Sequence, residues 1–310
     1  MTIEGLVIQA TGSWYEVLNG AERIKCRIRG KLRLKGVRST NPVVVGDIVR
    51  CECDQNGEWV IYDIVPRRNY IIRRASNLSK ESHIIAANID RAMIVVTLVE
   101  PVTALEFVDR FLVTCEAYKV PVTILLAKID LLRDNPDSVA EFHRIYEGAG
   151  YEVIDISATE GIGVERVKEM LSGKTTLLSG NSGVGKSTLI GAIDPTIDIR
   201  TGEISDSFHK GKHTTTFSTM YPIGNNGYII DTPGIKGFGT FDMEREEVSH
   251  YFREIFMVSA ECRFGNCTHT HEPGCAVLQA VAEGGIAESR FTSYLSMLED
   301  KDEDKYRGAT

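Results

Sequence analysis

The chain has 310 residues, of which 43% are hydrophobic and 25% charged, a composition typical of a globular protein with two or three domains. No apolar run is long enough to cross a bilayer, and the first residues, Met1 to Glu4, lack the basic and then apolar pattern of a signal peptide, so we expect a cytoplasmic protein. The net charge of −8 argues against nonspecific nucleic-acid binding by the chain as a whole.

The first part of the chain, residues 1–68, is expected to form a small β-barrel. Short runs rich in β-branched and aromatic residues are separated there by Gly, Asn and Asp turns. Five or six strands at this spacing favour an OB-fold. The expected strands are residues 6–8, 14–17, 24–28, 43–45, 48–53 and 59–61.

A basic strand in this barrel suggests a surface for RNA. Cations alternate with apolar residues from Arg23 to Arg29, which puts four cations on one strand face. Residues 1–80 hold 14 Lys and Arg against 8 Asp and Glu, a balance of +6 that leaves −14 for the rest. A solvated outer face is the simpler interpretation, but the further cations favour a surface that tracks a nucleic-acid backbone. The expected RNA-binding residues are Arg23, Lys25, Arg27, Arg29, Lys31, Arg33 and Lys35.

Residues 69–88 are expected to be a linker, because they follow Pro66 and contain a polar stretch around Asn77. Residues 89–240 then alternate between apolar runs and amphipathic segments, which predicts an α/β domain with a parallel sheet. The expected strands are residues 93–99, 122–127, 153–156, 175–179 and 228–230, and the expected helices are residues 105–118, 138–149, 163–171 and 186–193.

The segment from Gly180 to Ser187 matches the phosphate-binding P-loop pattern G-x-x-x-x-G-K-S, between an expected strand and an expected helix. The glycines let backbone N–H groups face phosphate oxygens. Lys186 is expected to reach the β- and γ-phosphates, and the Ser187 hydroxyl to bind Mg²⁺. The GTP-binding residues expected in this segment are Gly180, Asn181, Ser182, Gly183, Val184, Gly185, Lys186, Ser187 and Thr188.

A second phosphate-side motif, Asp231-Thr232-Pro233-Gly234, follows an apolar strand 45 residues after Lys186. We expect Asp231 to hold a Mg²⁺-bound water and the Gly234 N–H to contact the γ-phosphate. Between the motifs, a threonine-rich loop is expected to place Thr214 or Thr215 on Mg²⁺ beside GTP; the alternative is a polar loop that only leads into a strand.

Ile235 follows Gly234, at the place where Ras-like GTPases carry a glutamine that orients the attacking water. An isoleucine cannot orient water, so intrinsic hydrolysis should be slow, and another group or a partner must assist. His213 is the candidate in this chain, with an ordinary surface histidine as the alternative. The expected catalytic residues are therefore Lys186, Asp231, Gly234 and His213.

The segment Ala127-Lys128-Ile129-Asp130 resembles the guanine-reading N-K-x-D motif of GTPases. Asp130 is expected to accept from the guanine N1–H and exocyclic amine, and the Lys128 stem to cover the base. Ser157 and Ala158 follow the next strand and can offer a backbone N–H to the guanine O6. Ala127 stands where the motif has asparagine, so a contact to the base and a contact that supports the loop are lost. One such hydrogen bond is worth about 0.5–1.5 kcal/mol. We expect weaker affinity but retained specificity.

Residues 241–310 are expected to be helical and to bind zinc. The expected helices are residues 243–258, 275–282 and 288–299, followed by a charged tail. Cys262, Cys267, His269 and Cys275 form the pattern C-x4-C-x-H-x5-C, a complete tetrahedral set for one structural Zn²⁺. His271 is a competing imidazole, and free cysteines beside a His-rich turn are the alternative interpretation.

The order of the motifs is distinctive, because the guanine loop precedes the P-loop and Asp231 comes last. This order is a circular permutation of the GTPase domain. Together with an N-terminal barrel and a Cys3His site, the chain resembles the ribosome small-subunit-dependent GTPase A family, of the RsgA/YjeQ type. The resemblance implies a GTPase that binds the 30S subunit late in its maturation, is stimulated by it, and uses hydrolysis to time its release. It also implies contacts of the barrel and zinc domains with 16S rRNA and small-subunit proteins.

Three functions are consistent with the sequence. The first is a monomeric GTPase with Mg²⁺ and one structural Zn²⁺, activated by the small ribosomal subunit. The second is a non-catalytic, nucleotide-regulated RNA-binding assembly module, which Ile235 favours slightly. The third is an ATPase, suggested by Ala127. Intact Lys186, Ser187 and Asp231 favour the first.

Overall fold

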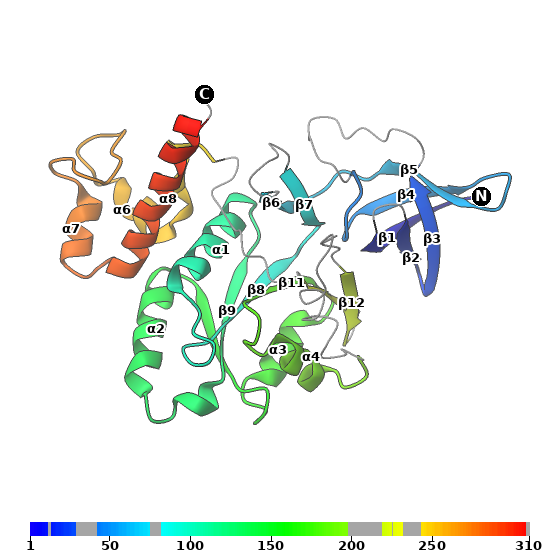
Figure 1. Cartoon of the computed structure of the whole chain (residues 1–310), viewed down its shortest axis with the longest axis horizontal. Helices are drawn as coiled ribbons and strands as arrows, with labels where there is room; N and C mark the ends of the chain where they lie inside the picture. The colour runs from blue at the N-terminus through cyan, green and yellow to red at the C-terminus, as the bar shows by residue number, and fades with distance from the viewer. Residues whose placement is uncertain are drawn as a thin grey trace.

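The structure is a computed structural model of the whole chain. It describes residues 1–11, 14–28, 42–74, 82–197, 219–224, 226–231 and 243–307. Three parts follow one another across the molecule: a β-barrel at one end, an α/β layer in the middle and a helical part at the other end (Figure 1). Among these residues no helix is both long and apolar enough to cross a membrane.

The N-terminal barrel consists of β1 (Thr2–Ala10), β2 (Tyr15–Asn19), β3 (Glu22–Ile28), β4 (Ile48–Cys53) and β5 (Trp59–Ile64). The strands pair in the order β1-β2-β3-β5-β4, and β4 returns to pair with β1, which closes the barrel. Its core is apolar, with Val7, Val17 and Ile61 fully buried. The strand expected at residues 43–45 does not form; only Val45 makes an isolated bridge, to Ala86.

The segment 69–88, expected to be a linker, contains a β-hairpin. The strands β6 (Tyr70–Arg74) and β7 (Ser82–Ala87) pair in antiparallel fashion. Ile71 and Ala86 are buried in the core of the α/β layer, and Ala86 also makes the bridge to Val45 of the barrel. The segment therefore contains a hairpin that packs against both neighbouring parts.

The central sheet has the order β10-β9-β8-β11-β13-β12. The bounds are β8 (Arg91–Val96), β9 (Val122–Ala127), β10 (Glu152–Ile156), β11 (Thr175–Ser179), β12 (Thr219–Ile223) and β13 (Gly227–Asp231). The first five strands in this order are parallel, and β12 is antiparallel to β13. A single pairing of β12 with β1, Gln9 with Thr219, joins the sheet to the barrel.

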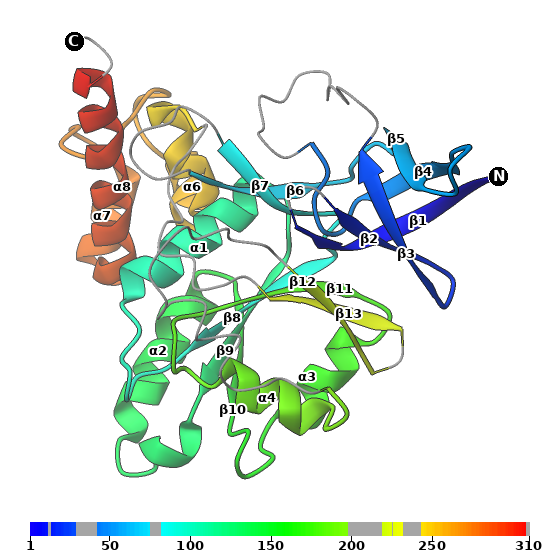
Figure 2. The same ribbon diagram turned by 45° about the vertical axis from the view of Figure 1, so that its right-hand side comes forward.

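Helices cover both faces of this sheet (Figure 2). On one face α1 (Leu105–Ala117) and α2 (Pro136–Gly148) pack on Ile94, Ile124 and their neighbours. On the other, α3 (Val164–Leu171) and α4 (Lys186–Ile193) pack on Met93 and Leu125. Neighbouring residues of a strand thus bury against opposite helix layers, which explains why β8 and β9 are apolar except at Arg91 and Thr123.

The C-terminal part contains η2 (Arg245–Tyr251), α6 (Arg253–Ser259), α7 (Ala276–Ala282) and α8 (Glu288–Arg307). The single helix expected at residues 243–258 is divided at Phe252, whose backbone is extended (φ −98°, ψ 100°) and whose side chain is fully buried. The charged tail expected after residue 299 continues α8 instead. Burial of the Phe252 ring in the core therefore stabilises this segment more than an unbroken helix would.

Candidate nucleotide and metal sites

The P-loop connects β11 to α4 at the carboxyl edge of the parallel sheet. Gly183 (φ 82°) and Gly185 (φ 101°) adopt left-handed backbone conformations that side chains disfavour. A Cβ on Gly180 would lie 2.6 Å from the carbonyl oxygen of Val95, so only glycine fits beside β8. The glycines of the motif are therefore required by the fold of the loop itself.

Lys186 is the first residue of α4, and its side chain reaches back into this loop. Its ammonium donates to the carbonyl oxygens of Gly180 at 2.7 Å and Asn181 at 2.9 Å, and only 9% of the residue is exposed. A positive charge is thus held within the loop, at the N-terminus of α4, where the helix dipole also favours anions. Ser187, the next residue, is partly exposed and available to a ligand.

The guanine loop lies at the same edge of the sheet. Ala127 ends β9, and Asp130 lies on the short η1 (Ile129–Leu132) that follows. Ile156 of β10 is in register with Ala127, so the adjacent loop, with Ser157 and Ala158, emerges beside the guanine loop. Parallel strands β9, β8 and β11 therefore bring the guanine loop and the P-loop to one side of the sheet.

The loop after β10 has a defined conformation of its own. The Ser157 N–H donates to the Ile162 carbonyl at 3.0 Å, and the Ser157 hydroxyl accepts from the Glu160 N–H at 3.2 Å. Glu160 in turn forms an ion pair with Arg133, which follows η1, at 2.6 Å. These contacts join the two loops expected to surround the base.

Asp231 ends β13, in register with Leu178 of β11, so its backbone lies next to the strand that leads into the P-loop. Its side chain lies outside the described part of the structure, as do His213, Thr214, Thr215 and Gly234. The backbone of Asp231 is therefore placed by its strand, and its role as a Mg²⁺ ligand, like the roles of the other four residues, remains a prediction.

One segment that the sequence analysis overlooked also reaches this site. The loop of residues 97–103 connects β8 to α1 and lies between the P-loop and the guanine loop, because β8 lies between β11 and β9. Lys128 donates to the carbonyl oxygen of Glu100, and Pro101 lies against Gly183. No recognisable motif marks this loop, so only the strand order could have revealed it.

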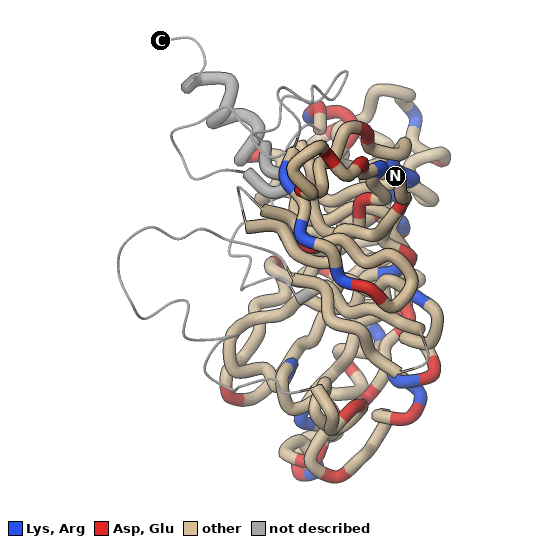
Figure 3. The backbone as a smooth tube through the Cα atoms, turned by 90° about the vertical axis from the view of Figure 1, so that its right-hand side faces the viewer, with Lys and Arg blue, Asp and Glu red and all other residues tan. Residues whose placement is uncertain are grey.

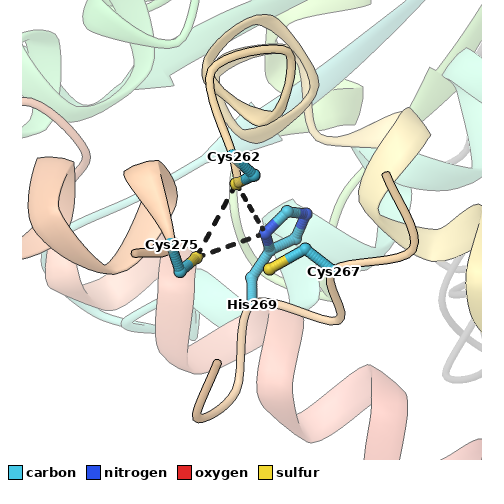
Figure 4. A group of neighbouring side chains, drawn as sticks. All are labelled: Cys262, Cys267, His269 and Cys275. Carbon is cyan, nitrogen blue, oxygen red and sulfur yellow. Dashed lines mark hydrogen bonds between the residues drawn. The ribbon is translucent and has the colours of Figure 1, made fainter. Parts of the chain in front are cut away.

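The four expected zinc ligands lie together in the C-terminal part (Figure 4). The Nδ1 atom of His269 is 3.6 Å from the sulfur of Cys262 and 3.5 Å from that of Cys275, whose sulfurs are 3.9 Å apart. The ligand atoms of these residues and of Cys267 all lie within 4.8 Å of one another. Sulfurs around a tetrahedral zinc with Zn–S bonds of about 2.3 Å lie about 3.8 Å apart. The cluster therefore fits one zinc ion.

His269 and not the competing His271 belongs to this cluster. His269 is 2% exposed, and burial lowers its pKa, which favours the neutral imidazole that a metal requires. The His271 ring is exposed and contacts the Thr270 hydroxyl at 2.8 Å. With three thiol groups and one imidazole, the set leaves no position open for a substrate, so its role is structural.

The basic strand of the barrel is β3. Its burial alternates as expected, with Ile24 and Cys26 inside and Arg23, Lys25 and Arg27 exposed. Two of these cations contact carboxylates, Arg23 with Glu16 at 3.7 Å and Arg27 with Glu58 at 3.6 Å. Basic and acidic positions therefore lie side by side at this end of the molecule (Figure 3). The other expected RNA contacts, Arg29, Lys31, Arg33 and Lys35, fall outside the described residues.

Comparison with known proteins identifies close relatives along the whole chain. A family model described as RsgA GTPase matches residues 64–241, and one described as RsgA N-terminal domain matches residues 4–61. The chain is 58% identical to the small ribosomal subunit biogenesis GTPase RsgA of Phocaeicola vulgatus, over 99% of this chain and 100% of that protein. It is 54% identical to that of Porphyromonas gingivalis, over 98% and 99% of the two chains.

Two solved structures share the fold. YjeQ from Thermotoga maritima superposes with a TM-score of 0.76 at 33% identity, covering 97% of this chain and 99% of that one. YloQ, described as a circularly permuted GTPase, superposes with a TM-score of 0.71 at 28% identity, covering 98% and 96%. The resemblance drawn from the order of the motifs is confirmed.

Proposed function

This chain belongs to the RsgA GTPase family, and on that premise we propose that it hydrolyses GTP to GDP and phosphate during biogenesis of the small ribosomal subunit. One structural observation carries the proposal. The loops after β9, β10 and β11, together with the end of β13, all emerge at the carboxyl edge of one parallel sheet, although the chain visits them in permuted order. This edge is where open α/β sheets bind nucleotides.

Different residues of the site bind different parts of the nucleotide. Lys186, held within the P-loop, neutralises phosphate charge, and the left-handed turns at Gly183 and Gly185 shape the loop around the phosphates. Asp130 selects guanine, because its carboxylate accepts from the N1–H and the exocyclic amine, whereas adenine offers an acceptor at N1. Mg²⁺ bound with GTP supplies charge neutralisation, with Ser187, Asp231 and Thr214 or Thr215 as its proposed ligands.

Slow hydrolysis by the chain alone is part of this proposal. Ile235 cannot orient the attacking water, so the rate depends on another group, with His213 as the candidate, or on a partner. The relatives of this chain are named for biogenesis of the small ribosomal subunit. We therefore assign stimulation of hydrolysis to the 30S subunit late in its maturation, and release of the protein to the loss of the γ-phosphate.

The two outer parts are proposed to hold the subunit. The exposed cations of β3 support a contact of the barrel with 16S rRNA, and the zinc-centred helical part presents a second surface to rRNA or small-subunit proteins. They lie at opposite ends of the nucleotide-binding part (Figure 1). The protein acts as a monomer in the cytoplasm.

Phosphate release from GTP, measured with and without 30S subunits, tests this function. We expect clear stimulation by 30S subunits and less by 50S subunits or 70S ribosomes. Lys186→Ala should remove both triphosphate binding and the stimulated rate, which shows that any activity comes from this P-loop. If 30S subunits bind but leave the rate unchanged, the protein is a nucleotide-regulated assembly module and not an enzyme of this kind. A site that ATP occupies as well as GTP would support the ATPase alternative.

A further inference from the structure

The loop of residues 97–103 occupies a central place in the nucleotide site. Its strand, β8, pairs with β9 on one side and β11 on the other, so the loop leaves the sheet between the guanine loop and the P-loop. An element at this position can fix the distance between the loop that reads the base and the loop that holds the phosphates.

The loop contacts both of its neighbours. On the guanine side, the Lys128 ammonium donates to the carbonyl oxygen of Glu100. Lys128 itself is in the left-handed conformation (φ 60°), which non-glycine residues adopt only in special contexts. On the phosphate side, a Cβ on Gly183 would lie 3.4 Å from Cδ of Pro101, so the proline ring lies directly against the P-loop.

Hydrogen bonds close the loop on itself. The Thr103 N–H donates to the Thr97 carbonyl at 2.8 Å, and the Thr103 hydroxyl accepts from the Thr97 N–H at 3.1 Å. The Thr97 hydroxyl donates to the carbonyl oxygen of Pro101. Both threonines are almost completely buried, with 0% and 2% of their surface exposed. These bonds hold Glu100 and Pro101 in place between the two nucleotide loops.

Ala127 explains why such a brace is needed. In the N-K-x-D motif, the asparagine at this position braces the guanine loop, and a methyl group cannot. Ala127 is 5% exposed and belongs to the same apolar cluster as Val184 of the P-loop. No polar group of residue 127 beyond its backbone can therefore connect the two loops.

We infer that the 97–103 loop takes the place of the missing asparagine, through the contact of Lys128 with Glu100 and the closure of the loop by Thr103. Thr103 is then a positioning residue for guanine recognition, and it acts without touching the nucleotide. The inference rests on the proposed GTP site, because it assumes that guanine binds beside Asp130 and Lys128. It predicts that disturbing the loop lowers affinity for guanine nucleotides selectively.

Titrations of the full-length protein with fluorescent GDP and ADP test the inference. Thr103→Val removes the hydroxyl at nearly constant volume, and Thr103→Ser keeps it. We expect Thr103→Val to weaken GDP binding about threefold to tenfold, the worth of one hydrogen bond, and to leave ADP binding unchanged. Thr103→Ser should remain within about twofold of the unsubstituted protein, and the thermal unfolding midpoints should show that each variant is folded.

A double-mutant cycle identifies the path of the effect. Lys128→Met removes the ammonium but retains a chain that can cover the base. If both residues act through the loop, Lys128→Met combined with Thr103→Val should weaken GDP binding little more than the stronger single change. In an Ala127→Asn background, the cost of Thr103→Val should fall below about twofold, because the amide again connects the loops.

The outcomes separate this inference from the function on which it rests. If the unsubstituted protein does not bind GDP more tightly than ADP, the proposed guanine site is wrong. If it does, but Thr103→Val weakens GDP and ADP equally, the loop supports only the P-loop and the inference fails. Multiplicative effects of Lys128→Met and Thr103→Val would likewise overturn it, because independent residues contribute independently.

Discussion

The guanidinium of Arg290 on α8 donates to the carboxylate of Asp109 on α1 at 2.8 Å, and these side chains expose 1% and 0% of their surface. Arg290 also donates to both carboxylate oxygens of Glu254 on α6, at 2.8 and 3.1 Å. The ring of Phe252 lies 4.7 Å from the guanidinium, and the Tyr146 hydroxyl donates to Asp109 at 3.1 Å. One buried arginine thus connects the zinc-binding part to the nucleotide-binding part.

Removing this arginine should destabilise the protein strongly. Arg290→Ala leaves two carboxylates buried without their partner, and breaking a buried ion pair in this way costs about 3–5 kcal/mol. Urea unfolding followed by fluorescence measures the loss. Arg144→Ala is the control, because Arg144 pairs with Glu141 on the surface, where an ion pair is worth at most about 1 kcal/mol. Similar losses for the two variants would show that the Arg290 cluster does not join the parts.

Loss of zinc should affect the C-terminal part and leave the nucleotide site nearly unchanged. Cys267→Ser removes one of the four ligands of the cluster in the C-terminal part. We expect zinc content, measured by atomic absorption, to fall well below one per chain, and binding to 30S subunits to weaken at least tenfold. The affinity for GDP should change by less than about twofold. An equal loss of the affinities for GDP and for 30S subunits would contradict the view that zinc supports subunit binding and not nucleotide binding.

Glu272 should determine the rate at which zinc dissociates, because it holds the loop that carries His269. Its carboxylate accepts from the N–H groups of Thr268 at 2.7 Å, Thr270 at 3.0 Å and His271 at 3.1 Å. These bonds surround His269, whose backbone is left-handed (φ 56°). Burial acts to raise the pKa of Glu272, but the hydrogen bonds outweigh it and lower that pKa, so the charged form is favoured.

We predict that Glu272→Gln, which keeps the shape but loses the charge, releases zinc to a chelator about tenfold faster, in line with the effect of residues that orient metal ligands. Release is followed with a colorimetric zinc indicator. Glu283→Gln, on an exposed side chain after α7, is the control. Unchanged release from Glu272→Gln would mean that the loop is held by other contacts, such as the Tyr294 hydroxyl on the Thr268 carbonyl at 2.8 Å.

Sequence and structure agree best where a short segment determines its own conformation. The P-loop glycines dictate a loop between strand and helix, and the four zinc ligands lie within fourteen residues, so both were predictable. The Arg290 cluster was not, because Asp109 is 181 residues away in the chain and Glu254 is 36. The 97–103 loop was missed for a related reason: its role follows from strand order. The division of the helix at Phe252 reflects tertiary packing, which overrides the helical pattern of the segment.

His143 should make stability depend on pH. Its Nε2 lies 2.9 Å from Asp155 and its Nδ1 2.9 Å from Glu147. Burial acts to lower the pKa of His143, but the two carboxylates outweigh it, so the pKa in the folded protein is raised. The stabilisation is then fully present below the unfolded value of about 6.5 and is lost as pH rises through the folded pKa.

The variant His143→Gln isolates this contribution. The difference in unfolding free energy between the unsubstituted protein and the variant should be larger at pH 6 than at pH 8.5, by up to about 1 kcal/mol for this partly exposed group. Urea unfolding at the two pH values measures it. A difference that is the same at both, or larger at pH 8.5, would show that His143 contributes through packing and not through charge.

Asp130→Asn should change which base the site prefers. The carboxylate accepts two hydrogen bonds from guanine, at N1–H and the exocyclic amine, and an amide offers one acceptor and one donor. Its NH₂ group would face the guanine amine, donor against donor, so GDP binding should weaken about 10- to 100-fold, as expected when hydrogen bonds to a charged group are lost. Xanthine has a carbonyl oxygen in place of that amine, and it retains N1–H. The same amide therefore complements xanthine, and XDP should bind the variant more tightly than GDP does. Competition of GDP, XDP and ADP for the site measures the order. If Asp130→Asn raises the affinity for ADP as much as the affinity for XDP, then Asp130 excludes bases by charge alone and does not recognise the edge of guanine.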